Sequence, residues 1–279
     1  MGYLAIVAIA KNEASYIAEW LEFHRLVGVE HVYVYDNGSI DDTREILASY
    51  IKNGFVTCIP WTSFDLNGLP QYQAYAHALC NFGPYWRWLA FIDVDEFLFP
   101  LKADNLQTVL PAYDDLPVVG VHWHMFGSSG HKRRPAGLVI ESYTKRAPIP
   151  SSIEEKRLSK WKSIVDPTKV QAVIGPHMFR LEDGRIGAYD ESRRWVGKSQ
   201  RASEASSILR LNHYFTKSDE ELVAKIAKGS PCKLPNENAG PKLWATKRAT
   251  VLEAEQVTDE AVLRFLVPLR DRMAFWSPD

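Results

Sequence analysis

The stretch Trp88-Leu89-Ala90-Phe91-Ile92-Asp93-Val94-Asp95-Glu96-Phe97 is an apolar run that ends in two aspartates one residue apart. A short apolar, aromatic run of this kind is typical of a strand buried on both faces of a parallel sheet. If the strand continues through Asp93 and Asp95, alternation puts both carboxylates on one face, where they can approach one hard divalent cation. The pattern therefore predicts an α/β fold with a metal site at the end of a strand.

Apolar strands alternate with amphipathic helices on the N-terminal side of this motif. Strands are predicted at residues 3–9, 31–35 and 55–60, and helices at residues 17–27, 42–50 and 71–82. Asn12 is expected to cap the first helix and Gly28 to end it. This order favours a parallel, doubly wound sheet with right-handed crossovers. Polar clusters follow three strands, at residues 11–13, 36–39 and 93–96. We expect them to meet in the crevice beyond the carboxyl ends of the strands, where ligands bind in such sheets.

The second half of the chain is less regular. Strands are predicted at residues 118–124, 163–165, 170–174 and 208–215, and two closing helices at residues 242–256 and 259–273. We find no internal repeat and no low-complexity linker.

Hydropathy and cysteine spacing indicate where the protein is located. The chain is 46% hydrophobic, but its apolar runs are too short to span a bilayer, and no basic leader precedes them. Cys58, Cys80 and Cys232 are far apart and are expected to be reduced, buried side chains. We therefore expect a cytoplasmic protein, or one at the inner face of the membrane.

Charge is unevenly distributed along the chain. Residues 1–120 carry 6 Lys and Arg against 15 Asp and Glu, whereas residues 131–170 carry 10 against 4. The basic segment is either a solvated face or a rim for an anionic ligand, including a peripheral contact with a membrane surface. Nucleic acid is not an expected partner, since the net charge is −1 and no recognition motif is present.

Several stretches of the chain form a recognisable set. They are Lys11-Asn12-Glu13, Glu19-Trp20 with His24, Tyr35 to Ser39 and Phe91 to Phe97, and more loosely Trp123 to Gly130, Lys162 to Val165, His177 to Phe179 and Asn212 to Phe215. Together they resemble the bacterial glycosyltransferases grouped with family 92 and the family-2-like enzymes. The resemblance implies a GT-A fold: a Rossmann-like, mostly parallel sheet with helices on both faces and an irregular acceptor-side half. It also implies a nucleotide-sugar donor, usually a UDP-sugar, and a Mn²⁺ or Mg²⁺ ion.

By this resemblance, Asn12, Glu13 and Asp36 would line the nucleotide pocket. Asp93 would face the ribose and the metal, and Asp95 would coordinate the metal directly. Related family-2 enzymes commonly carry two acidic residues where this chain has Asp36-Asn37, which bears on the choice of donor base.

Three further residues are candidates for the same site. His213 lies in a predicted strand and is either a core side chain or a further metal ligand, which is common in GT-A enzymes. An ordinary imidazole titrates near pH 6.5, so metal binding through His213 would weaken below that pH. Lys162 and Lys217 are candidates for contact with the diphosphate; the alternatives are a solvated strand end for Lys162 and an ordinary helix-start lysine for Lys217.

An inverting transfer also needs a general base for the acceptor hydroxyl. Glu141, Asp190 and Glu191 are candidates in the acceptor half, and nothing in their spacing selects one. A retaining transfer would not need such a base.

The sequence therefore predicts a metal-dependent glycosyltransferase, a hexosyltransferase acting on a glycan or lipid-linked acceptor in surface polysaccharide or lipopolysaccharide synthesis. We expect a GT-A domain over residues 1–230, with a donor half at about 1–100 and an acceptor half at about 118–230, and a C-terminal helical extension over 231–279.

Three other functions are alternatives to this prediction. A non-catalytic carbohydrate-binding protein would share the aromatic residues without needing a metal. A phosphohydrolase with Asp93 as nucleophile would usually carry Thr or Val where Phe97 stands. A nicotinamide-dependent enzyme would need a glycine-rich turn after the first strand, and none is present.

Overall fold

The computed structural model describes residues 1–62, 69–149, 160–197, 206–228 and 240–275. The helices are α1 (Ile17–Leu26), α2 (Thr43–Lys52), α3 (Pro70–Phe82), α4 (Leu106–Val109), α5 (Val139–Ser142), α6 (Asp219–Lys228), α7 (Gly240–Ala254) and α8 (Leu266–Phe275). Short 3₁₀ turns lie at Gly83–Tyr85, Leu110–Tyr113, Pro167–Lys169 and Ala261–Phe265.

Most strands join one large sheet. They are β1 (Gly2–Ala10), β2 (His31–Asp36), β3 (Val56–Pro60), β4 (Trp86–Phe91), β5 (Glu96–Pro100), β6 (Val118–Phe126), β7 (Lys145–Arg146), β8 (Trp161–Val165), β11 (Gly187–Tyr189), β12 (Trp195–Gly197), β13 (Leu209–Tyr214) and β14 (Val257–Thr258). A separate hairpin pairs β9 (Val170–Val173) with β10 (Phe179–Leu181). The main path runs β12-β11-β6-β8-β4-β1-β2-β3.

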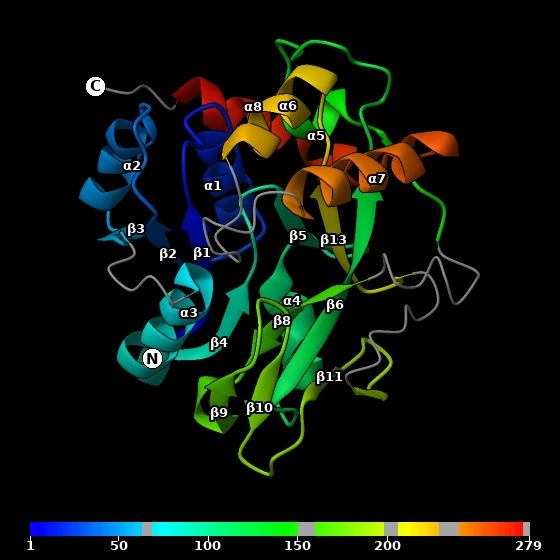
Figure 1. Cartoon of the computed structure of the whole chain (residues 1–279). Helices are drawn as coiled ribbons and strands as arrows, with labels where there is room; N and C mark the ends of the chain where they lie inside the picture. Colours follow the sequence, from blue (N-terminus) through cyan, green and yellow to red (C-terminus); the bar gives the residue numbers. More distant parts are fainter. Residues whose placement is uncertain (63–68, 150–159, 198–205, 229–239, 276–279) are drawn as a thin grey trace.

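The N-terminal half is the predicted parallel unit, which confirms the α/β fold class. β1 pairs in parallel with β2 and β4, and β2 pairs in parallel with β3. Along β1, Leu4 and Ile6 face the core that contains α1, whereas Ala5 and Val7 face a second core that contains α3. Because adjacent strand residues point to opposite faces, a continuous apolar run places helices on both sides of the sheet (Figure 1).

One predicted helix start is wrong. Asn12 does not cap α1: the residue before the helix is Tyr16, and the carbonyl of Glu13 accepts the N–H groups of Tyr16 and Ile17. Asn12 instead has a φ of 52° and belongs to the loop after β1. The predicted stop is confirmed, since Gly28 follows α1 with a φ of 93°.

The second half joins the sheet through β6. The N-terminal part of this strand pairs antiparallel with β8, and its C-terminal part pairs parallel with β13. β13 also pairs antiparallel with β5, which inserts it between β5 and β6. The helices α5 to α8 gather at the end of the molecule toward which β6 points (Figure 1).

Two smaller expectations were also tested. Cys58 and Cys80 carry no disulfide, but Cys80 is exposed on α3 rather than buried, and Cys232 lies outside the described residues. Among the described residues, no helix is long and apolar enough to cross a membrane.

Candidate active site

The acidic motif lies in a turn between β4 and β5. β4 ends at Phe91 and β5 begins at Glu96, whose N–H donates to the carbonyl of Asp93 at 3.0 Å. The strand therefore does not continue through the aspartates, and the prediction of a shared strand face is wrong. The two carboxylates have separate partners, and the turn adds Glu96 to the acidic group.

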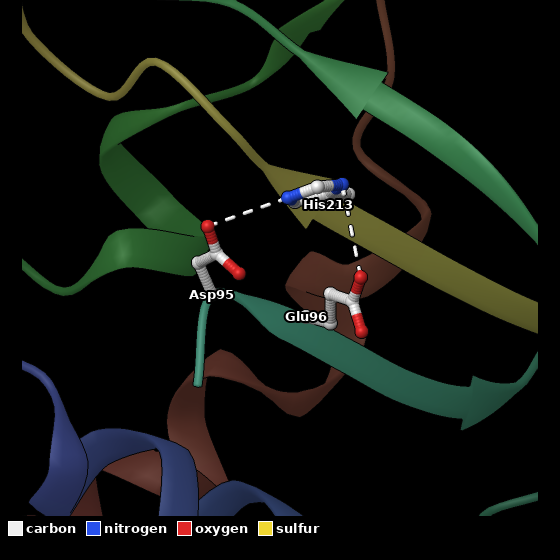
Figure 2. A group of neighbouring side chains, drawn as sticks. All are labelled: Asp95, Glu96 and His213. Atoms are coloured by element: carbon white, nitrogen blue, oxygen red, sulfur yellow. Dashed lines mark hydrogen bonds and ion pairs between the residues drawn. The ribbon is translucent and has the colours of Figure 1, made fainter. Parts of the chain in front are cut away.

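Asp95, Glu96 and His213 form the cluster that the strand pairing brings together. His213 of β13 stands opposite Glu96 of β5 in the antiparallel register, so their side chains lie on the same face. Its Nε2 is 3.3 Å from Asp95 Oδ2, and its Nδ1 is 3.8 Å from Glu96 Oε1 (Figure 2). The three residues each offer a ligand atom within 4.8 Å of the others.

The donor atoms of this cluster suit a divalent cation. Glu96 Oε1 and His213 Nδ1 are buried and have no hydrogen-bond partner among the described residues. Burial lowers the pKa of His213 to about 4, against the opposing effect of Asp95. The imidazole is therefore neutral at physiological pH, the form that binds metal, and the expected weakening near pH 6.5 is wrong.

Asp95 is held ionised by two side chains from the second half of the chain. Burial alone would raise its pKa, but the ammonium of Lys225 and the imidazole of His213 outweigh burial and hold the pKa well below its usual range. Lys225 of α6 lies 2.5 Å from Asp95 Oδ2. Asp95 is thus a carboxylate at any physiological pH.

Asp93 belongs to a second ionic group on the other side of the turn. Its carboxylate accepts from Lys162 Nζ at 2.7 Å and from Gln71 Nε2 at 2.9 Å. Lys162 also lies 3.6 Å from Glu96 Oε2. Burial would lower the pKa of Lys162, but Asp93 and Glu96 hold it well above its usual range, so a permanent positive charge sits beneath the motif. A metal-ligand role for Asp93 stays a prediction.

The polar residues after β1 and β2 meet as expected. The Asn12 N–H donates to Ser39 Oγ at 2.9 Å, and Asn12 Oδ1 accepts the Ile40 N–H at 2.9 Å. Asp36 is buried, accepts the Ser39 N–H at 3.0 Å and pairs with Arg44. The nucleotide-binding roles of Asn12 and Asp36 stay predictions, on a loop that is already well ordered by its own hydrogen bonds.

Positive charge reaches this edge from two C-terminal elements. The ammonium of Lys217 lies 3.4 Å above the ring of Tyr16, and burial lowers its pKa. Glu13, after β1, pairs with Lys228 of α6. Arg248 of α7 is buried with its guanidinium 5.1 Å from the rings of both Trp123 and Phe215.

None of the three base candidates contacts the Asp95–Glu96–His213 cluster within the described residues. Glu141 accepts the Leu138 N–H at the start of α5 and pairs with Arg270. Asp190 accepts the N–H groups of Ser192 and Arg194. The carboxylate of Glu191 accepts three consecutive N–H groups, those of Ser207, Ile208 and Leu209. Leu209 is four residues before His213 on β13, about 13 Å along the strand.

Glu96, Lys225 and Arg248 were absent from the sequence-based candidates. Glu96 belongs to the acidic motif, and an acidic residue close after two aspartates is a signal in itself. Lys225 and Arg248 carry no local signal, because their positions depend on how α6 and α7 pack on the sheet.

Comparison with known proteins gives a family for most of the chain. Residues 5–229 match glycosyltransferase family 92. A family 92 protein of Ricinus communis is 30% identical over 220 residues, which are 76% of this chain and 35% of that protein. One of Arabidopsis thaliana is 29% identical over 227 residues, with the same coverage. The beta-1,4-galactosyltransferase galt-1 of Caenorhabditis elegans is 26% identical over 227 residues, 76% of this chain and 48% of that protein. The chain thus spans about a third to a half of the length of these relatives.

Solved structures are more distant. A fragment of S. aureus TarS in complex with UDP has a TM-score of 0.40 at 14% identity, over 88% of this chain and 70% of that chain. Glucosyl-3-phosphoglycerate synthase from Mycobacterium tuberculosis, in complex with Mn²⁺, UDP and glucosyl-3-phosphoglycerate, has a TM-score of 0.30 at 18% identity, over 44% of each chain. With the family match extending over residues 5–229 of 279, this chain belongs to glycosyltransferase family 92.

Proposed function

We propose that this chain catalyses metal-dependent transfer of a sugar from a UDP-sugar to a hydroxyl group of a glycan or glycolipid. The observation that carries the proposal is the Asp95–His213 pair, which joins the acidic turn to β13 at the edge of the sheet where ligands of such folds bind. Family membership supports glycosyl transfer, and the galactosyltransferase relative makes UDP-galactose the first donor to test.

In this proposal Asp95, Glu96 and His213 hold the ion. A bound divalent cation supplies positive charge that stabilises a diphosphate leaving group. The mixed oxygen and nitrogen ligands favour Mn²⁺ over Mg²⁺, which prefers an all-oxygen shell. Lys162 and Lys217 add fixed positive charge beside it, and Asn12, Glu13 and Asp36 form the nucleotide side.

The acceptor side is proposed from the basic segment 131–170. Lys132 and Arg133 are exposed in its first loop, where they suit an anionic or lipid-linked saccharide at a membrane surface. Such an acceptor fits surface polysaccharide or lipopolysaccharide synthesis.

The test is release of UDP from UDP-sugars, with and without saccharide acceptors, in Mn²⁺ and in EDTA. Asp95→Asn and His213→Gln are expected to lower Mn²⁺-dependent turnover by about 10- to 100-fold or more, with Asp104→Asn, whose side chain is 97% exposed, as the matched control. Equal turnover in EDTA, or full activity of Asp95→Asn, would exclude this metal site. Saccharide binding without turnover of any nucleotide sugar would instead favour the non-catalytic alternative.

A further inference from the structure

Helix α6 carries two lysines that contact acidic residues at the ends of two different strands. Lys225 and Lys228 are three residues apart and so lie on one face of the helix. Lys225 Nζ contacts Asp95 Oδ2 at 2.5 Å and the carbonyl of Phe215 at 2.9 Å. Lys228 pairs with Glu13 after β1. One helix thus supplies counter-ions to both the acidic turn and the loop after β1.

The contact of Lys225 conflicts with metal binding. The oxygen it contacts, Asp95 Oδ2, is the same atom that lies 3.3 Å from His213 Nε2. A cation held by Asp95 and His213 would have to share that oxygen with an ammonium group. Because like charges repel strongly at such a separation, the ion and Lys225 compete for Asp95.

The balance of charge indicates where the displaced lysine goes. Lysine ammonium groups already lie beside the carboxylates of the site: Lys162 contacts Asp93, Lys225 contacts Asp95 and Lys228 pairs with Glu13. A divalent ion would add two positive charges to this group, and a nucleotide-sugar diphosphate would bring about two negative ones. A lysine released from Asp95 therefore gains a new anionic partner beside the ion.

We propose that Lys225 is the resident counter-ion of Asp95 in the metal-free protein and transfers to the donor diphosphate when the metal binds. This inference rests on the proposed function and adds to it a positioning and binding residue from α6. The ring of Phe215, 4.1 Å from the ammonium, and the Phe215 carbonyl keep Lys225 at the site while it exchanges partners.

The test uses two titrations of Lys225→Gln whose expected changes have opposite signs. Mn²⁺ alone should bind about 3- to 10-fold more tightly, because a competing cation is gone. UDP in saturating Mn²⁺ should bind about 10-fold or more weakly, because a charged hydrogen-bond donor is gone. Lys225→Arg, which keeps the charge, should retain UDP affinity within about threefold. Lys52→Gln, at the exposed end of α2, is the matched control and should change neither affinity.

A structural lysine would give a different pattern. Weaker binding of both Mn²⁺ and UDP, or no change in either, would overturn the inference, as would tighter Mn²⁺ binding with unchanged UDP affinity. If the wild-type protein binds Mn²⁺ and UDP and Lys225→Gln matches it, only the inference fails. If the wild-type protein binds neither, the proposed function fails and the inference fails with it.

Discussion

Asp36 has a buried carboxylate whose ionic partner is exposed. Its carboxylate is buried at the end of β2, yet one oxygen is held by Arg44, whose side chain is 54% exposed. An exposed partner of this kind can move aside for a ligand at little energetic expense, since exposed ion pairs contribute little stability. The nucleotide role predicted for Asp36 is therefore compatible with its contacts.

We expect Asp36→Ala to weaken uridine nucleotide binding in EDTA by about 10- to 100-fold, corresponding to the loss of one charged hydrogen bond of about 1.5–3 kcal/mol. Arg44→Ala is the matched control, since it removes the other half of the ion pair and should leave nucleotide affinity nearly unchanged. Calorimetric titration of both variants measures the difference. Equal losses in the two variants would show that the ion pair orders the loop and that Asp36 does not contact the nucleotide.

The metal-ligand candidates were predictable from residue type, whereas their grouping was not. Asp95 and His213 stand out locally, as an acidic residue after an apolar run and a histidine within one. Glu96 joins them and Asp93 contacts Lys162 because of the turn formed by the four residues Ile92 to Asp95, which strand periodicity cannot reveal.

At the scale of the element, the end of α1 depends on a glycine. Gly28 has a φ of 93°, and a Cβ built there would lie 2.0 Å from Asn105 Oδ1. Asn105 in turn caps α4 by accepting the Gln107 N–H at 2.7 Å. The end of α1 and the start of α4 therefore both depend on the close packing of Gly28 against Asn105.

Gly28→Ala should lower the free energy of unfolding by about 2–4 kcal/mol, from left-handed backbone strain and the displacement of Asn105. Gly54→Ala is a matched control: its φ is 79°, but nothing lies within 4 Å of its Cβ position, so only about 1 kcal/mol of strain is expected. Chemical denaturation of both variants compares them. Equal losses would mean that Asn105 moves away freely.

Helix α1 also stabilises α5 through a buried carboxylate. Glu19 accepts the N–H groups of Val139 and Ile140 at 2.7 and 3.1 Å. Burial nonetheless raises its pKa from 4.5 to about 7, against those hydrogen bonds. The folded protein thus binds this proton more tightly than the unfolded chain does.

A raised pKa of this kind adds stability that is fully present below pH 4.5 and is lost as the pH rises through 7. The contribution of Glu19 should therefore fall by about 3 kcal/mol over that range. Glu19→Gln should remove this part of the pH dependence, and Glu45→Gln on the exposed face of α2 should not. Denaturant titrations from pH 4 to 8 measure it, and an unchanged slope in Glu19→Gln would assign the pH dependence to other groups.

Elements with their own apolar periodicity could be predicted from the sequence, whereas elements whose place depends on long-range packing could not. The strands β1 to β4 and helices α1 to α3 were predicted because each has its own apolar period. β5 could not be recognised as a separate strand, because Glu96–Pro100 directly follows the acidic turn and continues the motif. Helix α6 was missed too, and its place at the site follows from packing rather than from its own residues.

One of the two cores contains residues from both ends of the described chain. Val262, Phe265 and Leu269 are buried in the same cluster as β1 and α1. α8 lies against α1, far from it in sequence (Figure 1). Although the family match ends at residue 229, these C-terminal helices complete the core of the N-terminal half. The predicted boundary near residue 230 stays a prediction, but it would separate elements that pack together.

Leu269→Ala should therefore destabilise the entire protein by about 2–5 kcal/mol in one cooperative transition, as expected for a fully buried leucine. Val267→Ala, two residues away and 67% exposed, should change stability by no more than about 0.5 kcal/mol. Thermal unfolding followed by both tryptophan fluorescence and circular dichroism tests this. A separate, early transition confined to the C-terminal helices would show that they fold as an appendage.

The contact between Asp95 and His213 joins residues 118 positions apart. A ribosome that has added Asp95 must add more than a hundred further residues before it adds His213, which takes on the order of ten seconds at ordinary rates of synthesis. Lys162 is made just over halfway through that interval, whereas β13 is completed only at its end and Lys225 after it. Until then Asp95 lacks its histidine partner, so a growing chain acquires this cation-binding geometry only once β13 has been made.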